Sequence, residues 1–207
     1  MITVIDYGMG NLRSVTKAFE LFTDKVMVSS NPDSIYESSG VVLPGDGAFP
    51  QAMENLEKKN WIIPLKNYIQ NDGFFLGICL GYQLLFSESE EFIHTRGLDI
   101  IPGKVVKFHT ENLKIPHMGW NQVSFKKESV FLNNIDDLTY FYFIHSYYPE
   151  IEDSDWIIGT SEYGKIFPCI VGKKNLIASQ FHPEKSHKSG LKIIENFSRL
   201  SDGSIKD

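Results

Sequence analysis

The residues that decide the fold are 74–83, FFLGICLGYQ, in which an apolar run leads into a Gly-x-Cys-x-Gly turn. The run 74–76 is typical of a short buried strand, and residues 80–86 predict a helix directly after the turn. A sharp strand-to-helix turn of this kind is a nucleophile elbow, which needs small residues on both sides of the reactive side chain. The two glycines meet that need. The pattern therefore predicts that the Cys79 sulfur is exposed at a helix N-terminus, where the helix dipole favours thiolate.

On the N-terminal side of this turn, short β-branched runs alternate with helical patterns. This order predicts an α/β fold with a mostly parallel central sheet flanked by helices on both faces. The expected strands are 2–5, 25–28, 40–43 and 74–76, and the expected helices are 12–22, 48–56 and 62–69.

The C-terminal half has a different pattern, with strand-like runs separated by short turns. It predicts hairpins and an antiparallel or mixed portion added to the parallel sheet, closed by a helix over residues 189–200. The expected strands are 104–108, 121–125, 139–143, 156–160, 166–171 and 176–180. With no repeat and no long linker, we expect one domain over residues 1–200 and a loose tail over 201–207.

A thiolate nucleophile needs a histidine that shares its proton. His182 and Glu184 follow an apolar strand pattern, and residues i and i+2 of an extended chain face the same side. Pro183 favours extended geometry at His182, so Glu184 can orient the imidazole as the third member of a triad. Without the elbow, His-Pro-Glu would more often be a surface loop. Cys169 lies inside a strand pattern and is expected to fill the core.

Composition excludes several classes of function. The chain has 207 residues, a net charge of −6 and a pI of about 5.5, which argues against a nucleic-acid or anionic-membrane partner. No apolar run approaches the roughly 18 residues that a membrane span needs, and Met1 is not followed by a signal peptide. Two cysteines are too few for a zinc cage or a disulfide framework. We expect thiols in a reducing cytoplasm, with no metal and no cofactor.

Two motifs together resemble the signature of class I (triad) glutamine amidotransferases. They are the elbow at residues 77–83 and the sequence QFHPE at residues 180–184. Three further motifs, DYGMGN at 6–11, PHMGWN at 116–121 and YFIHSY at 142–147, resemble the glutaminase subunits of imidazole glycerol phosphate synthase. The resemblance covers nearly the whole chain and implies that family's fold.

The resemblance implies a role for each matching residue. Cys79 would attack the side-chain amide of L-glutamine, His182 would transfer protons, and Glu184 would orient His182. The backbone N–H of Leu80 and the loop at residues 43–47 would form the oxyanion hole, with Gly45 and Asp46 at its centre. The residues implied to hold glutamine are Gly47, Gln83, Ser146 and Tyr147, and those implied to face the partner or its ammonia channel are Asn11, Met118, Trp120 and Asn121.

The resemblance also implies a heterodimer with a (β/α)8-barrel cyclase that receives the ammonia. Two other functions stay open at this point: a paralogous subunit that supplies ammonia to another synthase, such as one amidating a surface sugar, and a regulatory subunit without catalysis. Several residues also have plainer interpretations. Trp120 could belong to the core, Gly45 and Gly47 could serve only a turn, and Asn11 fits a helix N-cap.

One residue departs from the family pattern. Asp46 stands where the family has a small apolar residue. The backbone N–H is retained, but a carboxylate here is expected to affect the resting geometry of the oxyanion loop.

Overall fold

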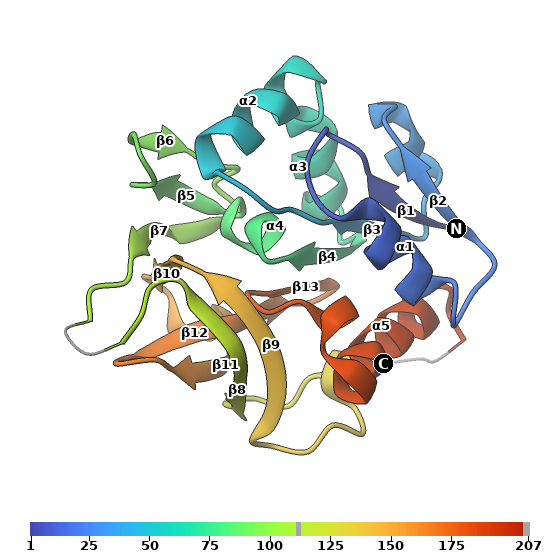
Figure 1. Cartoon of the computed structure of the whole chain (residues 1–207). Helices are drawn as coiled ribbons and strands as arrows, with labels where there is room; N and C mark the ends of the chain where they lie inside the picture. Colours follow the sequence, from blue (N-terminus) through green and yellow to red (C-terminus); the bar gives the residue numbers. More distant parts are fainter. Residues whose placement is uncertain (111–112, 205–207) are drawn as a thin grey trace.

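A nine-stranded sheet runs through the computed structural model, which describes residues 1–110 and 113–204 (Figure 1). Its strand order is β2-β1-β3-β4-β13-β12-β11-β8-β9. The first five strands are parallel, and from β13 to β9 every neighbouring pair is antiparallel. The predicted mostly parallel sheet with an antiparallel addition is confirmed, and β13 is the strand where the two parts meet.

The strands of this sheet are β1 (Ile2–Ile5), β2 (Val26–Ser29), β3 (Gly40–Leu43), β4 (Phe74–Ile78), β8 (His117–Phe125), β9 (Thr139–His145), β11 (Ile157–Glu162), β12 (Ile166–Lys173) and β13 (Leu176–Ser179). A second, four-stranded sheet has the order β10-β7-β5-β6. Its strands are β5 (Phe86–Ser89), β6 (Thr95–Arg96), β7 (Ile101–Lys107) and β10 (Tyr147–Ile151).

Helices cover both faces of the parallel part (Figure 1). On one face, α1 (Leu12–Phe19) and α5 (His187–Ser201) bury apolar side chains in the same core cluster, with Phe19 packed edge-on against Phe197. On the other face, α2 (Phe49–Lys58) and α3 (Ile62–Gln70) belong to a second core cluster, which also includes side chains of the small sheet. Residues of β1, β3 and β4 enter both clusters, because successive side chains of a strand point to opposite faces.

The predicted helix at 80–86 is wrong in length. Helix α4 comprises only Leu80–Gln83, and Phe86 already begins β5, which pairs with β7. Tertiary pairing overrides the local pattern here because Leu84, Leu85 and Phe86 are fully buried and fill the core between the two sheets. The helix predicted over 12–22 likewise ends at Phe19.

The C-terminal helix is longer than predicted. Helix α5 extends to Ser201, which is buried, so the first residue of the expected tail belongs to the helix. Residues 205–207 of that tail lie outside the described part. Within the described ranges, no helix has the length and apolar character needed to cross a membrane.

Candidate active site

The nucleophile elbow lies between β4 and α4, with Cys79 at its tip. Cys79 has φ 55° and ψ −102°, a backbone conformation that L residues rarely adopt. Strain of this kind costs about 1–3 kcal/mol and persists only where the surroundings enforce it. Gly81 makes the turn sterically possible, because a Cβ at that position would lie 1.9 Å from the carbonyl oxygen of Leu43. The glycine thus allows α4 to sit directly against β3.

The short helix changes the explanation of thiolate stabilisation. With four residues, α4 has too few aligned peptide dipoles to supply the macrodipole that the sequence pattern suggests. The N–H of Leu80 is in the first turn and therefore has no intrahelical acceptor, so it remains available to an oxyanion. A thiolate at Cys79 would therefore depend on neighbouring side chains for its stabilisation.

His182 reaches the elbow because β13 pairs in parallel with β4. The N–H of Cys79 donates to the carbonyl of Ser179 at 2.8 Å, which brings the chain after β13 beside the sulfur. His182 is extended, with φ −97° and ψ 99°, as its position before proline predicts. Its N–H donates to Tyr142 O at 3.0 Å, and the hydroxyl of Ser186 donates to its carbonyl at 2.6 Å.

The three predicted triad residues lie together. Cys79 and His182 line the same cavity, and Nδ1 of His182 lies 2.8 Å from Oε1 of Glu184. Burial alone lowers the pKa of His182, but the nearby Cys79 sulfur and the carboxylate of Glu184 raise it to about 10. The side chain of Glu184 is 1% exposed, and within the described ranges its Oε2 has no hydrogen-bond partner. A buried carboxylate with one partner depends on that partner, which makes the pair mutually stabilising.

The sulfur opens into a cavity of about 390 Å³, within the range of small-molecule sites. The predicted substrate-binding residues and most of the predicted oxyanion residues line it. Gly45 and the triad residue Glu184 do not line the cavity. The lining residues are Asp46, Gly47, Cys79, Leu80, Gln83, Glu91, Pro116, Ile144, His145, Ser146, Tyr147, His182 and Lys185.

The predicted oxyanion loop, residues 43–47, packs closely on the elbow. A Cβ on Gly45 would lie 2.7 Å from the Tyr7 hydroxyl oxygen and 2.8 Å from Leu80 Cβ, so only glycine allows this approach. The departure at Asp46 has a visible consequence: its Oδ1 accepts the N–H of Gly10 at 2.9 Å. The carboxylate therefore ties the oxyanion loop to the turn after β1.

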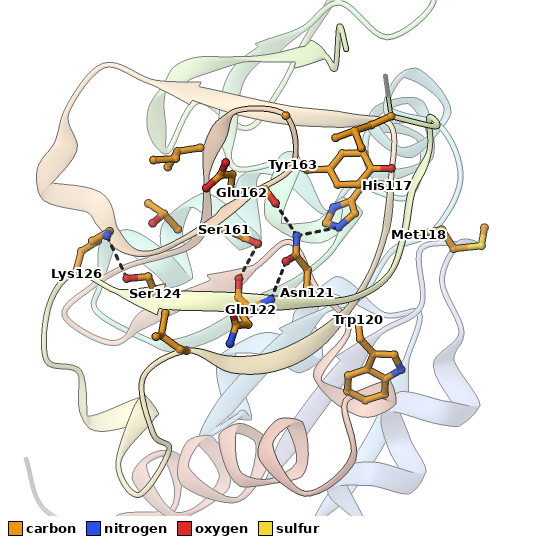
Figure 2. A pocket seen from close by; sticks show the side chains of 15 residues that line it. His117, Met118, Trp120, Asn121, Gln122, Ser124, Lys126, Ser161, Glu162 and Tyr163 are labelled. Atoms are coloured by element: carbon orange, nitrogen blue, oxygen red, sulfur yellow. Dashed lines mark hydrogen bonds between the residues drawn. The ribbon is translucent and has the colours of Figure 1, made fainter. Parts of the chain in front are cut away.

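The predicted partner-facing residues lie elsewhere. Met118, Trp120 and Asn121 line a second, open cavity of about 630 Å³ beside β8 and β11 (Figure 2). Met118 and Trp120 are 59% and 44% exposed, and the Trp120 ring stacks on His187 at 4.8 Å, so the core interpretation of Trp120 is wrong. Asn11 caps α1, its Oδ1 accepting the N–H of Ser14 at 3.1 Å, as its N-cap interpretation predicts.

Sequence reasoning did not assign three further residues to the site. Glu91 lines the cavity and accepts the N–H of Phe49 at 2.7 Å, and burial raises its pKa. Gln180 donates its amide N–H to the Cys79 sulfur at 3.8 Å. Lys185 adds a positive charge to the cavity wall. Only Gln180 lies within a quoted motif, and its adjacency to His182 is the one clue that could have identified it. Cys169 is fully buried in β12, as predicted for core filler.

The described residues contain no group of three or more His, Cys, Asp or Glu side chains arranged to hold a metal ion. The site instead has the components of thiol chemistry: a strained cysteine, a histidine, a buried carboxylate and free backbone N–H groups beside a cavity.

Comparisons with known proteins identify the family. Residues 3–200 match the family model described as glutamine amidotransferase class-I. The chain is 49% identical over 204 residues to imidazole glycerol phosphate synthase subunit HisH 1 of Methanococcus maripaludis, covering 97% of this chain and 100% of the relative. It is 50% identical over 204 residues to the HisH subunit of Methanocaldococcus jannaschii, with the same two coverages.

Among solved structures, the fold resembles the glutaminase domain of Trypanosoma brucei CTPS. The TM-score is 0.71 at 14% identity, covering 100% of this chain and 95% of the other. It also resembles PurLQS of Thermotoga maritima, with a TM-score of 0.75 at 14% identity and coverages of 96% and 97%. At these identities the likeness concerns the fold alone. The family match and the relatives at about half identity establish that the chain belongs to the class-I glutamine amidotransferases, in the branch of the imidazole glycerol phosphate synthase HisH subunits.

Proposed function

We propose that this chain is the glutaminase subunit of an imidazole glycerol phosphate synthase, in which residues 1–200 form one amidotransferase domain. It hydrolyses L-glutamine to glutamate and ammonia and passes the ammonia to a cyclase subunit. The observation that carries this proposal is the meeting of Cys79, His182 and Glu184 beside one cavity, although about a hundred residues separate the first from the other two.

In the proposed reaction, the Cys79 thiolate attacks the side-chain amide carbon of glutamine. The carbonyl oxygen becomes an oxyanion, which the N–H of Leu80 and the loop at Gly45 and Asp46 stabilise. Protonated His182 gives its proton to the departing nitrogen, so the C–N bond breaks, ammonia leaves and a γ-glutamyl thioester remains. His182 then takes a proton from water, the resulting hydroxide attacks the thioester, and glutamate and the thiolate are released.

The cavity has groups that suit an amino-acid substrate. A free amino acid carries an ammonium group. Glu91 is a partly buried carboxylate on the cavity wall, and among the described residues the hydrogen bond it accepts is to Oε2, from the N–H of Phe49. We assign the ammonium of glutamine to Glu91, and further contacts to Gly47, Gln83, Ser146 and Tyr147. Both hydrogens of the Gln83 amide are already engaged, so Gln83 would offer its Oε1 to the substrate.

The partner in this proposal is a cyclase built as a (β/α)8 barrel, which docks on the face formed by Met118, Trp120 and Asn121. An exposed Trp and Met side by side suit a protein interface, where aromatic residues and methionine are enriched. Asn11 would lie toward the ammonia channel. Channelling has a chemical reason: at neutral pH free ammonia is mostly ammonium, which is not a nucleophile. We place the heterodimer in the cytoplasm, where Cys79 and Cys169 remain free thiols.

The direct test is glutamine hydrolysis by wild type and Cys79→Ala, each with and without the cyclase and its nucleotide ligand. We expect glutamate formation by the wild-type complex and a loss of at least about a thousandfold in Cys79→Ala. No glutamate from the wild-type complex would refute the enzymatic proposal in favour of a regulatory role. Complementation of a histidine auxotroph that lacks this subunit separates the histidine pathway from a synthase with another product.

A further inference from the structure

The carbonyl oxygen of Tyr147 anchors a buried hydrogen-bond network behind the catalytic sulfur. It accepts from Nε2 of Gln83 at 3.0 Å and from Nδ1 of His145 at 2.8 Å. A backbone carbonyl is an acceptor only, so the nitrogen end of the Gln83 amide and a protonated Nδ1 of His145 must face it. This one atom therefore sets the direction of two chains of hydrogen bonds.

The first chain runs from Gln83 to the sulfur. The second N–H of the Gln83 amide donates to Oε1 of Gln180 at 3.0 Å. Because the oxygen of Gln180 is turned toward Gln83, its Nε2 is turned toward Cys79, whose Sγ lies 3.8 Å away. Gln83 is 5% exposed and Gln180 is fully buried, so bulk water does not compete for these groups. Because Tyr147 O and Gln180 Oε1 can only accept, the group of Gln180 that faces the Cys79 sulfur is its N–H donor.

The second series of hydrogen bonds runs from His145 through His117 to Asn121. Its donors and acceptors are consistent with a protonated Nδ1 on His145. With Nδ1 protonated, neutral His145 accepts at Nε2 from Nδ1 of His117, at 3.0 Å, and His117 in turn faces Nδ2 of Asn121 at 3.3 Å. The orientation of Asn121 follows from the N–H of Gln122, which donates to Oδ1 at 2.8 Å, and the carbonyl of Glu162, which accepts from Nδ2 at 2.8 Å (Figure 2). The two ends thus specify the same tautomers.

Both imidazoles of this second chain are neutral near pH 7. Burial lowers the pKa of His117 to about 4 and that of His145 to about 3. Nδ1 of His145 carries a proton in this neutral tautomer and in the imidazolium alike, so it donates to Tyr147 O in either state and the nitrogen end of the Gln83 amide still faces that carbonyl. The donor that faces Cys79 is therefore constant across the range in which a thiol enzyme works.

The other groups around the sulfur do not replace this donor. The carbonyl oxygen of Ile144 lies 3.9 Å from Sγ and accepts from a thiol, which favours the S–H form. His182 lines the same cavity as the sulfur but must release its proton to the leaving nitrogen in the proposed reaction. Tyr7 hydrogen-bonds Pro44 O at 3.0 Å. The remaining charged groups are Asp46, Glu91 and Lys185, on the cavity wall.

We propose that the side-chain amide of Gln180, oriented by Gln83, donates to the Cys79 thiolate and stabilises the sulfur in its ionised form. Gln83 is then a positioning residue, and its contact with Tyr147 aligns the donor. A hydrogen bond to an ionised acceptor is roughly twice as strong as one between neutral groups, so the amide favours thiolate over thiol. This inference rests on the proposed role of Cys79 as the nucleophile.

The test is the pH dependence of Cys79 alkylation by iodoacetamide, with the modified peptide identified by mass spectrometry. Gln180→Met removes the donor at similar size, and Gln180→Glu keeps an oxygen toward Gln83 but loses the amide. We expect the alkylation midpoint to rise by about one pH unit in each, which is about a tenfold slower reaction on the acid side. Gln51→Glu, on the exposed face of α2, makes the same chemical change and should leave the midpoint unchanged.

The role of Gln83 has a separate signature. Gln83→Met should raise the midpoint by less than Gln180→Met does, and the double variant should shift it no further than Gln180→Met alone, because both changes act on one donor. A purely structural contribution would lower the melting temperature of these variants without moving the midpoint. An unchanged midpoint in folded Gln180 variants would overturn the inference.

If both Gln180 variants fail to fold, the wild-type chain still decides. The side-chain amide resonances of Gln180 in an NMR spectrum should move with pH at the midpoint of Cys79 alkylation and stay fixed in Cys79→Ala. Resonances that do not move in wild type would refute the contact. Failure of the proposed function would look different, because the wild-type complex would then form no glutamate, or Cys79→Ala would form it as fast as wild type.

Discussion

The parallel and antiparallel parts of the sheet contribute to the site in different ways. The parallel part supplies the elbow between β4 and α4 and the oxyanion loop after β3, and its geometry depends on glycines that allow backbone to touch backbone. The antiparallel part supplies β8 and β9, whose inward side chains at this end include the polar pair His117 and His145. Steric fit determines the geometry that the parallel part gives to the site. Hydrogen-bond direction determines the geometry that the antiparallel part gives to it.

The difference shows where each part is vulnerable. A single added methyl group disrupts the elbow, because the neighbouring atom is a backbone carbonyl that cannot move aside. The histidine pair is sensitive to protonation rather than to steric fit, because contacts with Tyr147 and Asn121 set its tautomers. Substitutions in each part can test this contrast.

The largest expected effect is on folding of the elbow. Gly81→Ala places a methyl group 1.9 Å from Leu43 O, and we expect the free energy of unfolding to fall by about 4 kcal/mol or more. Gly119→Ala, in the antiparallel part, meets no atom within 4 Å and strains only a φ of +133°, so about 1–2 kcal/mol should be lost. Urea unfolding of both variants measures the difference, and equal losses would contradict the steric explanation.

Next is the orientation of the imidazole that joins the two parts. Glu184→Gln keeps the shape of the side chain but removes the charge beside His182 Nδ1, and we expect kcat to fall on the order of a hundredfold or more. Glu195→Gln on α5 makes the same change at a salt bridge with Arg199 and should leave kcat within about twofold of wild type. Steady-state glutamine hydrolysis in the complex compares them. Similar kcat values for the two variants would remove Glu184 from the mechanism.

Acid should destabilise the antiparallel part selectively. His117 and His145 have pKa values of about 4 and about 3 when folded, below the ordinary value of 6.5. Since the unfolded chain binds more protons below pH 6.5, the free energy of unfolding falls as pH drops from 6.5 through 4. In His117→Gln, which cannot titrate, we expect that fall to be smaller by on the order of 2 kcal/mol. Chemical denaturation at pH 6.5 and pH 4 provides the measurement. An equal fall in the free energy of unfolding in wild type and in His117→Gln would argue against neutral histidines.

The smallest effect concerns the tie between Asp46 and Gly10. Asp46→Ala removes the acceptor of the Gly10 N–H, which should cost at most about 1 kcal/mol because the carboxylate is exposed. Amide hydrogen exchange at Gly10 should accelerate in Asp46→Ala and remain near the wild-type rate in Asp46→Asn, which retains an acceptor oxygen. Unchanged exchange in Asp46→Ala would show that the tie does not hold the loop.

Much of the site follows from short-range pattern. The spacing Gly77, Cys79, Gly81 after an apolar run predicts the elbow because the steric demands of that turn are local. The pair His182 and Glu184 follows from the period of an extended chain and from Pro183 between them. In contrast, Glu91 could not be assigned to the cavity, because nothing near it in sequence records that the segment after β5 meets the start of helix α2 at Phe49.

The amino-acid sequence by itself determined the mostly parallel architecture and the elbow, and it predicted the triad of Cys79, His182 and Glu184, since these depend on residue periodicity and on glycine at fixed offsets. Only the tertiary structure decided that α4 is a single turn and that Gln180 presents a donor to the sulfur. The direction of a hydrogen bond is set by whichever backbone acceptor lies at the end of the network. Here that acceptor is Tyr147 O, 64 residues from Gln83, and no local pattern of residues encodes the contact.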